Sequence, residues 1–452
     1  MSNLPFNSRN NKFFISIYWN LFDSIVTQAL LIIHNILLQK FIGTYFHGLF
    51  SITFSLFYLF VILLNLGLDY SLAIFIKDIV KDKQSLLHFI KYQIVPQIIL
   101  ISIFSLISSF IVIKYQNIIK TPFKDLINLN LIFTVALTFI SESVKKTLRA
   151  FLQLVLMTKT TALVESIGMY FYIATVWTSY IINIDITLEY CWLILLIISI
   201  LQVLILSYNL YKYYSNLQNN SKYIISYEYQ ELIKIRTFNW IFQMSAQLFN
   251  SNFFVPFCSL YLDLHKASYI KIYWSIAQWI NSIINKNINI SLAISFANFK
   301  DKYFNIFKYL SYIFYQILYS IIIILLINVN KIKFFIMDND MQNHYIYIMI
   351  FIIFIEPFFN FYEKLFILEK RSISFSIFTV IYITTALLIS KYMLNYFSIS
   401  IILASIIILR LFTIISMSVT FLNQKNIYLD LKPHYKTIIF SLILALLYKF
   451  LY

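Results

Sequence analysis

Residues 63–74 read Leu-Leu-Asn-Leu-Gly-Leu-Asp-Tyr-Ser-Leu-Ala-Ile, and residues 283–294 read Ile-Ile-Asn-Lys-Asn-Ile-Asn-Ile-Ser-Leu-Ala-Ile. The two stretches align without a gap and share the Asn and the Ser-Leu-Ala-Ile ending. An even number of apolar runs separates them, so both copies would cross a membrane in the same direction. The repeat therefore predicts two parallel halves related by an axis along the membrane normal. Chance similarity between two Ile- and Leu-rich helices is the alternative.

The composition around this repeat is that of a polytopic helical membrane protein. Hydrophobic residues make up 60% of the chain and charged residues 12%, and the mean hydropathy is +0.78. The net charge of +16 gathers in short clusters between apolar runs, a pattern that sets membrane orientation and does not indicate nucleic acid. The two cysteines form no metal or disulfide pattern. We also expect no removable signal peptide, because the first apolar run is itself a span.

Apolar runs between charged breaks predict an all-α protein with twelve membrane spans in two six-helix lobes around a central cavity. The N-terminal lobe covers 1–211, a cytoplasmic linker 212–236 and the C-terminal lobe 237–422. Residues 423–452 hold a cytoplasmic segment and a thirteenth run, which either crosses the membrane or lies in its interface. The predicted spans are 13–39, 47–76, 89–113, 126–157, 160–183, 187–211, 237–262, 267–298, 304–329, 344–369, 372–391 and 396–422.

The distribution of Lys and Arg predicts the orientation. Basic residues on the N-terminal side of the spans, Arg236 among them, outnumber those on the opposite side about two to one. Lys271 is counted with the opposite side, and His34 and His47 are expected at that interface. The bias places the N-terminus in the cytoplasm.

Three of the four glycines lie close together, at Gly43, Gly48 and Gly67. Glycine is kept where φ must be positive or where backbones approach closely. In a chain with so little glycine, the cluster marks a structural or gating region. Asp69 follows it and is expected to serve in helix packing or in a gate.

The first 80 residues resemble the polysaccharide (O-antigen-type) flippase family of the multidrug/oligosaccharidyl-lipid/polysaccharide (MOP) exporter superfamily. The similarity rests on a polar Gln in the first span, a glycine turn, and a second span that ends in Leu-Gly-Leu-Asp before a basic residue. It also includes a Phe-Leu-Gln-Leu stretch that leads through a lysine into the fifth span. These features are Gln28, Ile42-Gly43 to Gly48, Leu66 to Ala73, Lys77, Phe151-Leu-Gln-Leu and Lys159.

The resemblance implies a transporter that moves an undecaprenyl-diphosphate-linked oligosaccharide from the cytoplasmic to the outer leaflet of a bacterial inner membrane. The implied partners are that substrate, membrane lipids, a polysaccharide polymerase and a chain-length regulator. Such a protein needs a cavity for the sugar, cations for the diphosphate and a lateral gap for the lipid tail. No cofactor is implied, but a proton or sodium gradient could drive transport.

The fourth span carries Glu142, Lys145, Lys146 and Arg149, at spacings that place them on one helix face. Charges inside a bilayer cost about 2.5–3.5 kcal/mol each, so those that persist usually face a cavity or a partner. The three basic residues are therefore candidate diphosphate ligands. The alternative is a Glu142–Lys146 pair within the helix, with Arg149 reaching the cytoplasmic headgroups.

The second lobe has polar candidates of its own. Lys286 with Asn285 and Asn289 would form a sugar-binding strip, because amides both donate and accept hydrogen bonds. The alternative is polar contact between helices. Arg410 lies near the middle of the last span and is either a cavity cation or the partner of a buried acid.

Asp23, Glu142 and Glu356 lie near the middle of their spans. Each is a candidate site for the coupling ion, because a buried carboxyl group readily takes up a proton. Structural pairing with Arg410 or a lysine is the alternative for each.

The same features exclude several other functions. The chain lacks the glycines of a nucleotide-binding loop and has no soluble domain to hold catalytic groups, so we expect no enzyme activity. A polysaccharide polymerase would show a large outer loop, and every predicted outer loop is short. An ion-coupled multidrug exporter or a lipid II flippase remains the alternative within the same fold.

Overall fold

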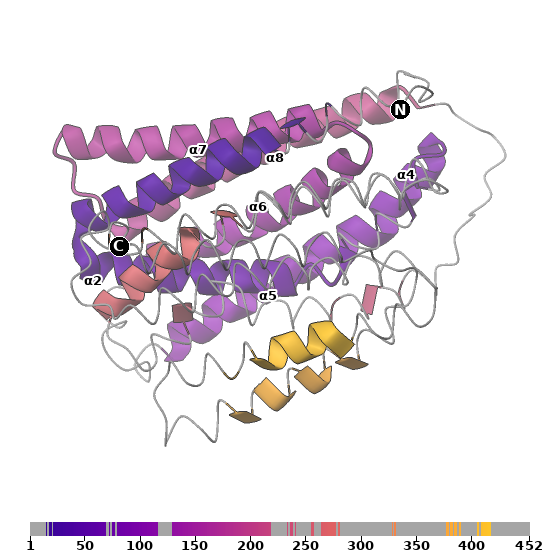
Figure 1. Ribbon diagram of the computed structural model, residues 1–452. Coiled ribbons are helices and arrows are strands. Elements are labelled where there is room, and N and C mark those ends of the chain that lie inside the picture. Colours follow the sequence, from indigo (N-terminus) through magenta and orange to yellow (C-terminus); the bar gives the residue numbers. More distant parts are fainter. Residues whose placement is uncertain are drawn as a thin grey trace, which may run out of the picture.

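The computed structural model describes residues 21–68, 79–115, 129–217, 264–276 and 408–416, along with shorter stretches and single residues such as 236, 240, 279 and 382. Within those residues every regular element is a helix, which confirms the predicted all-α class. The long helices run roughly side by side in one bundle (Figure 1). Among the helices so described, Asp23–Leu63, Lys83–Lys114 and Leu188–Ser215 are long and apolar enough to cross a membrane.

The first two predicted spans form a helical hairpin. A π-helical turn, η1 (Asp23–Thr27), leads into α2 (Gln28–Leu63), and Gly43 within α2 has φ +80° and ψ +159°. This conformation is outside the helical region and is open mainly to glycine. Gln39 and His47, on either side of Gly43, both hydrogen-bond to Ser268, so the two arms lie next to each other. Gly43 thus provides the turn expected of it.

The second predicted span, 47–76, is interrupted rather than continuous. The helix stops at Leu63, and a turn follows over residues 64–67. Leu66 and Gly67 in that turn have φ values of +48° and +72°, which no helix accommodates. The stretch that opens the internal repeat therefore contains a helix break within the second predicted span.

The rest of the N-terminal half follows the predicted spans to within a few residues. It contains α4 (Lys83–Phe89), η2 (Ile90–Ile94), α5 (Val95–Tyr115), α6 (Leu129–Leu154), α7 (Thr158–Ile181) and α8 (Leu188–Ser215). Asp82 caps α4 by accepting from the Ser85 N–H at 2.7 Å, and Thr187 caps α8 in the same way. Helix α8 continues to Ser215 and so extends into the predicted linker.

Packing within this half places α6 at its centre. Helix α8 lies along α6 and α7, and α5 packs on the opposite side of α6. Trp192 of α8 is fully buried against Phe57 of α2 and Phe139 of α6. Phe110, Phe171 and Leu204 point outward and are 60–65% exposed, as expected of side chains that face lipid.

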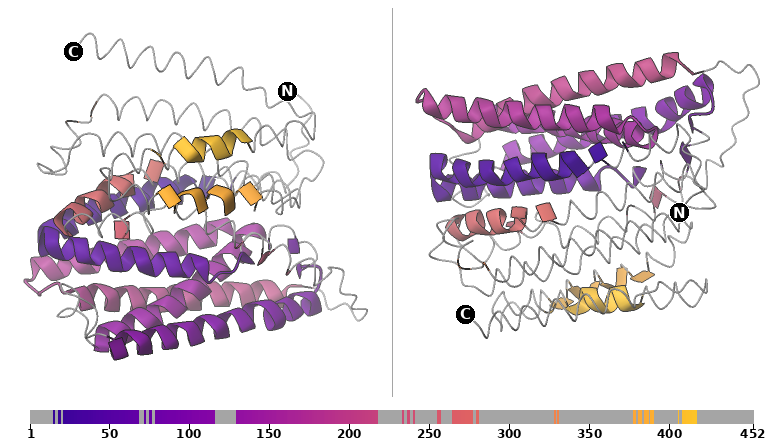
Figure 2. Two further views of the ribbon diagram at one scale, coloured as in Figure 1. Left: turned by 90° about the horizontal axis from the view of Figure 1, so that it is seen from below. Right: turned by 45° about the horizontal axis from the view of Figure 1, so that its top comes forward.

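The described residues of the C-terminal half all lie on one side of this bundle. Residues 264–276, 279 and 280 run beside α2, and the described residues between 377 and 416 lie beyond them (Figure 2). The contact of α2 and its π-helical turn with residues 264–276, 279 and 280 is called the seam below.

Candidate functional site

A group of buried charges joins the first helix to α6 and α7. Asp23 begins the π-helical turn, and its side chain is 2% exposed. Arg149 Nη2 lies 3.2 Å from Asp23 Oδ2, and Arg149 also forms an ion pair with Glu165 of α7. An unpaired buried charge costs several kcal/mol, so these three side chains hold one another in place. π-Helical turns are frequent at functional sites, which makes Asp23 a notable residue.

The other oxygen of the Asp23 carboxylate accepts hydrogen bonds from two hydroxyl groups. Thr27 Oγ1 lies 3.0 Å and Ser166 Oγ 3.3 Å from Asp23 Oδ1, and the two hydroxyls are 2.8 Å apart. Asp23 is therefore enclosed by a cation and two hydroxyls contributed by three helices. A proton or small cation bound here would compete with Arg149 for the carboxylate. The arrangement can thus couple ion binding to the packing of η1 against α6 and α7.

A second polar cluster lies on α6 one to two helical turns before Arg149. Lys145 Nζ is 2.5 Å from Glu142 Oε1, and Tyr58 of α2 donates to Glu142 Oε2 at 3.2 Å. Lys145 also donates to Gln202 of α8 at 3.1 Å. This cluster links α2, α6 and α8, just as the first links η1, α6 and α7.

The structure brings three of the four predicted α6 residues into these clusters. The helical pair that we considered was Glu142–Lys146, but Lys145 is the residue that contacts Glu142. Arg149 turns inward to two carboxylates and not toward the headgroups. Lys146 is half-buried on the same helix. The positive charges of Lys145 and Arg149 are thus offset by acids in this conformation.

The remaining glycine, Gly168 of α7, makes room for Gln202. A Cβ built at Gly168 would lie 2.1 Å from Gln202 Nε2. That same nitrogen donates to the Val164 carbonyl oxygen at 3.0 Å. Since only glycine allows this approach, Gly168 positions the amide that contacts Lys145. Neither Gly168, Gln202 nor Glu165 is singled out by the sequence pattern.

The seam is built from neutral hydrogen-bonding side chains. Asn35 donates to Ser275 at 3.4 Å and Gln39 donates to Ser268 at 2.9 Å. His47 Nδ1 lies 2.8 Å from the same Ser268 hydroxyl. All five side chains are buried, with exposed fractions of 8% or less.

One cation lies among these groups. Lys271 is 7% exposed, donates to Ser55 at 3.3 Å and lies 5.2 Å from the centre of the Phe54 ring. His34 is buried nearby in α2, against Tyr172 of α7. Lys271, which the charge count places on the opposite side, is therefore buried by protein, as are His34 and His47. Hydropathy alone could not reveal that other helices cover these side chains.

The seam also reaches the π-helical turn that carries Asp23. The Trp279 indole N–H donates to the Ile25 carbonyl oxygen at 3.2 Å. Ile25 lies two residues from Asp23 within the same turn. A change in the environment of Asp23 can thus be transmitted to the C-terminal half through Trp279.

Gly48 allows the two halves to approach closely at one end of the seam. A Cβ at this position would lie 2.0 Å from the Leu264 carbonyl oxygen and 2.9 Å from its carbon. Nearby, Thr44 Oγ1 lies 2.6 Å from His265 Nδ1. The glycine cluster thus serves three separate purposes: a turn at Gly43, a close approach at Gly48 and a helix break at Gly67.

The helix break is held by residues from the start of the C-terminal half. Arg236 donates to Gln97 Oε1 at 2.8 Å and also hydrogen-bonds to Gln93. Its Nε lies 3.5 Å from the Leu66 carbonyl oxygen. Arg236, which the charge count assigned to a cytoplasmic loop, is therefore partly buried between the two halves.

Two further donors complete this contact, which we call the Arg236 latch. The Trp240 indole N–H donates to the Leu63 carbonyl oxygen at 2.6 Å. Gln97 Nε2 lies 3.0 Å from both the backbone and the side-chain oxygens of Asn65. A broken helix leaves carbonyls without their usual partners, and in a membrane these must be satisfied by protein. The latch supplies donors to the carbonyls of Leu63, Asn65 and Leu66, in addition to the turn bonds that those of Leu63 and Asn65 accept from backbone N–H groups.

Arg410 is the described candidate of the C-terminal half. It is fully buried and lies 5.3 Å from the centre of the Tyr382 ring, a cation–π contact. The predicted cavity residues Lys286, Asn285 and Asn289 lie outside the described residues, as do Glu356 and Asp69.

Comparison with known proteins identifies the fold. No protein-family model matches the sequence, and no curated protein sequence is significantly similar. Solved structures do match over most of their length. The MATE multidrug transporter DinF-BH, solved in complex with a ligand, has a TM-score of 0.67 at 10% identity, covering 94% of this chain and 97% of its own.

Two other solved structures have a similar fold. The eukaryotic MATE transporter AtDTX14 gives a TM-score of 0.66 at 11% identity, covering 91% of this chain and 95% of its own. A MOP-superfamily transporter from Pyrococcus furiosus gives 0.62 at 10% identity, covering 89% and 93%. The chain is thus a multi-pass, all-α protein with the fold of the MATE transporters of the MOP superfamily.

Proposed function

We propose that this protein is an alternating-access transporter that flips an undecaprenyl-diphosphate-linked oligosaccharide from the cytoplasmic to the outer leaflet. The observation that carries the proposal is the chemistry of the seam. Asn35, Gln39, Ser268 and Ser275 pair with one another across it. Amides and hydroxyls are the groups that recognise sugar hydroxyls, because they can donate and accept hydrogen bonds.

In this mechanism the seam alternates between two sets of partners. When the lobes are together, the seam side chains satisfy one another and the empty protein remains closed. When the lobes part, the same groups become available to the oligosaccharide, and Lys271 supplies a positive charge for the diphosphate. The hydrogen bonds lost between the seam side chains are replaced by hydrogen bonds to the oligosaccharide. The net free-energy cost of opening therefore remains low.

The buried charges of the N-terminal half would couple this cycle to an ion gradient. A proton or Na⁺ at Asp23 weakens its attraction to Arg149 and changes the packing of the π-helical turn. Trp279 contacts that turn through the Ile25 carbonyl, so the change reaches the seam. Coupling of this kind requires that the ion bind the two conformations with different affinity.

The choice of a lipid-linked oligosaccharide is also supported by the glycine pattern. Gly43 and Gly48 are part of the resemblance to polysaccharide flippases. Gly43 has a positive φ, and Gly48 lies too close to the Leu264 backbone for a Cβ atom. The proposal includes a bacterial inner membrane, a cytoplasmic N-terminus, and a polysaccharide polymerase and chain-length regulator as functional partners.

A second candidate function is ion-coupled multidrug export. It is supported by the fold neighbours, among them the multidrug transporter DinF-BH. A buried acid in the first helix, Asp23, would suit a cationic drug as well as a coupling ion.

Deletion of the gene separates the two candidates. A flippase mutant should accumulate lipid-linked oligosaccharide on the cytoplasmic face and lose surface glycan, and the full-length gene should restore both. Normal surface glycan together with increased sensitivity to cationic dyes would refute the flippase and support the exporter. The Gln39→Leu variant should fail to complement, whereas Thr237→Ala, which changes an exposed side chain outside the seam, should complement fully.

A further inference from the structure

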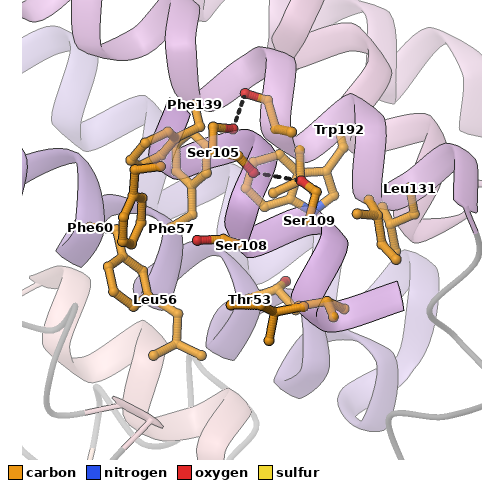
Figure 3. Close-up of a pocket in the computed structure, with 16 residues that line it drawn as sticks. Thr53, Leu56, Phe57, Phe60, Ser105, Ser108, Ser109, Leu131, Phe139 and Trp192 are labelled. Atoms are coloured by element: carbon orange, nitrogen blue, oxygen red, sulfur yellow. Dashed lines mark hydrogen bonds between the residues drawn. The ribbon is translucent and has the colours of Figure 1, made fainter. Parts of the chain in front are cut away.

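An apolar groove lies in the wall of the N-terminal half, away from the seam hydrogen bonds. Its volume is about 450 Å³. Figure 3 shows Phe57, Phe60 and Phe139 on one side of the groove and Leu131 and Trp192 on the other. Helices α2, α5 and α6 form its walls, and Trp192 is its contribution from α8.

The groove lies between α2 and α5, away from the point where the two are tied together. That tie is the contact of Gln97 of α5 with Asn65, in the turn that follows α2. Along the groove α5 presents small side chains, Ser105, Ser108 and Ser109, which leave the space unfilled. The hydroxyl of Ser105 donates to the Ala136 carbonyl oxygen, so it adds little polarity (Figure 3).

The rim of the groove is open to the bilayer. Leu56, Phe60 and Ile111 line it and are 38%, 41% and 49% exposed, whereas Phe57 and Trp192 at its floor are buried. All of these positions lie within helices that are long and apolar enough to cross a membrane. A hydrocarbon chain suits a groove with such an apolar lining, at a depth where lipid replaces water as the solvent.

The groove adjoins the charged cluster of α6. Phe57 lines the groove, and the next residue, Tyr58, hydrogen-bonds to Glu142. Phe139, on the same side of the groove as Phe57, lies one helical turn before Glu142. A lipid whose headgroup is handled between the lobes would thus find an apolar path beside polar side chains on the same helices.

We propose that this groove holds part of the isoprenoid chain of the lipid-linked substrate during transport. The inference rests on the proposed flippase function and adds to it a site for the lipid tail. The flat rings of Phe57, Phe60, Phe104, Phe139 and Trp192 suit a chain of planar, methyl-branched units. With the N-terminus in the cytoplasm, the groove lies in the outer half of the membrane, where the tail ends its passage.

Photolabelling of the full-length protein in lipid nanodiscs tests this site. The probes are a polyprenyl phosphate with a diazirine in its chain and a phosphatidylglycerol with a diazirine in one acyl chain. The polyprenyl probe should label peptides within residues 104–112, and unlabelled polyprenyl phosphate should compete. Ser108→Leu, which fills the groove, and Leu56→Trp, which blocks its exposed rim, should each lower labelling about tenfold.

The matched control is Ser102→Leu, the same substitution on α5 at a serine that does not line the groove. It should leave labelling unchanged. The proposal is refuted if the polyprenyl probe leaves residues 104–112 unlabelled, if the phospholipid probe labels them equally well, or if neither groove variant reduces labelling. Labelling requires no transport. Flipping without labelling would therefore refute only the proposal that the groove holds the lipid tail, and not the flippase function. Labelling without flipping would refute the proposed function and leave a polyprenyl-binding groove.

Discussion

Gly48 of α2 lies so close to Leu264 that a Cβ at Gly48 would be 2.0 Å from the Leu264 carbonyl oxygen. The neighbour is backbone, which cannot rotate away as a flexible side chain can. Residues 216 positions apart in sequence therefore meet where only a hydrogen atom fits between them. This contact defines one end of the seam, and the alternating access proposed above would require it to form and to break.

The first prediction concerns that contact. Gly48→Ala should disfavour the closed seam, because overpacking of this kind costs about 1–3 kcal/mol. Cysteines introduced at Thr44 and His265, whose side chains now lie 2.6 Å apart, should then form a disulfide about tenfold more slowly. Phe46→Ala, at an exposed position of the same helix, serves as the control. An unchanged cross-linking rate in Gly48→Ala would show that the close approach is not required.

The second prediction concerns the buried charges around Arg149. Arg149→Gln leaves Asp23 and Glu165 without their cation and should lower the free energy of unfolding by about 3 kcal/mol. Addition of Asp23→Asn should recover part of that loss, because one of the two unpaired charges is removed. Thermal unfolding in detergent measures both effects, with Lys212→Gln, at an exposed site in the last turn of α8, as the control. If Asp23→Asn adds to the loss, the pairing has been assigned incorrectly.

The third prediction uses the contact between Gly168 and Gln202. Gly168→Ala should displace the Gln202 amide and cost about 1–3 kcal/mol, because the Val164 carbonyl and Lys145 lose a partner. In the Gln202→Ala background the same change should cost much less, since the side chain that it displaces is already gone. A double-mutant cycle of unfolding free energies measures this coupling. Equal costs in both backgrounds would contradict it.

The fourth prediction concerns the Arg236 latch. Arg236→Ala removes the donor to Gln93 and Gln97, so amide hydrogen exchange in peptides that span residues 60–68 should become faster. Trp240→Phe, which keeps an aromatic ring but removes the N–H, should have a smaller effect in the same direction. Thr237→Ala changes an exposed residue between them and should leave exchange unaltered. No change in Arg236→Ala would mean that the break is held by other groups.

Periodicity and composition were sufficient to predict the class of fold, and the bounds of α6, α7 and α8 to within about four residues. They also identified Gly43 and Gly48 as positions where the fold requires glycine, because glycine is so rare in this chain. The spacing of Glu142, Lys145 and Arg149 placed these residues on one face of a helix, which is how the structure has them.

The partners of these residues could not be predicted in the same way. Glu165 and Gln202 contact the α6 charges from helices whose relative rotation is a tertiary property. Lys271 lies near the end of a predicted span, and nothing in its sequence context indicates that it is buried against α2. The charge pattern likewise places Arg236 in a loop. In each case the deciding factor is a helix distant in sequence, which a single-chain pattern does not encode.

Transport of the lipid-linked oligosaccharide itself tests the central claim most directly. The purified protein is reconstituted into liposomes that contain a fluorescent polyprenyl-diphosphate oligosaccharide, and the rate at which the sugar reaches the opposite leaflet is measured with and without an ion gradient. The account predicts flipping above that of protein-free liposomes, accelerated by the gradient. Gln39→Leu should reduce the rate about tenfold and Asp23→Asn should abolish the acceleration. A rate equal to that of protein-free liposomes, in a preparation that still transports a cationic dye, would contradict it.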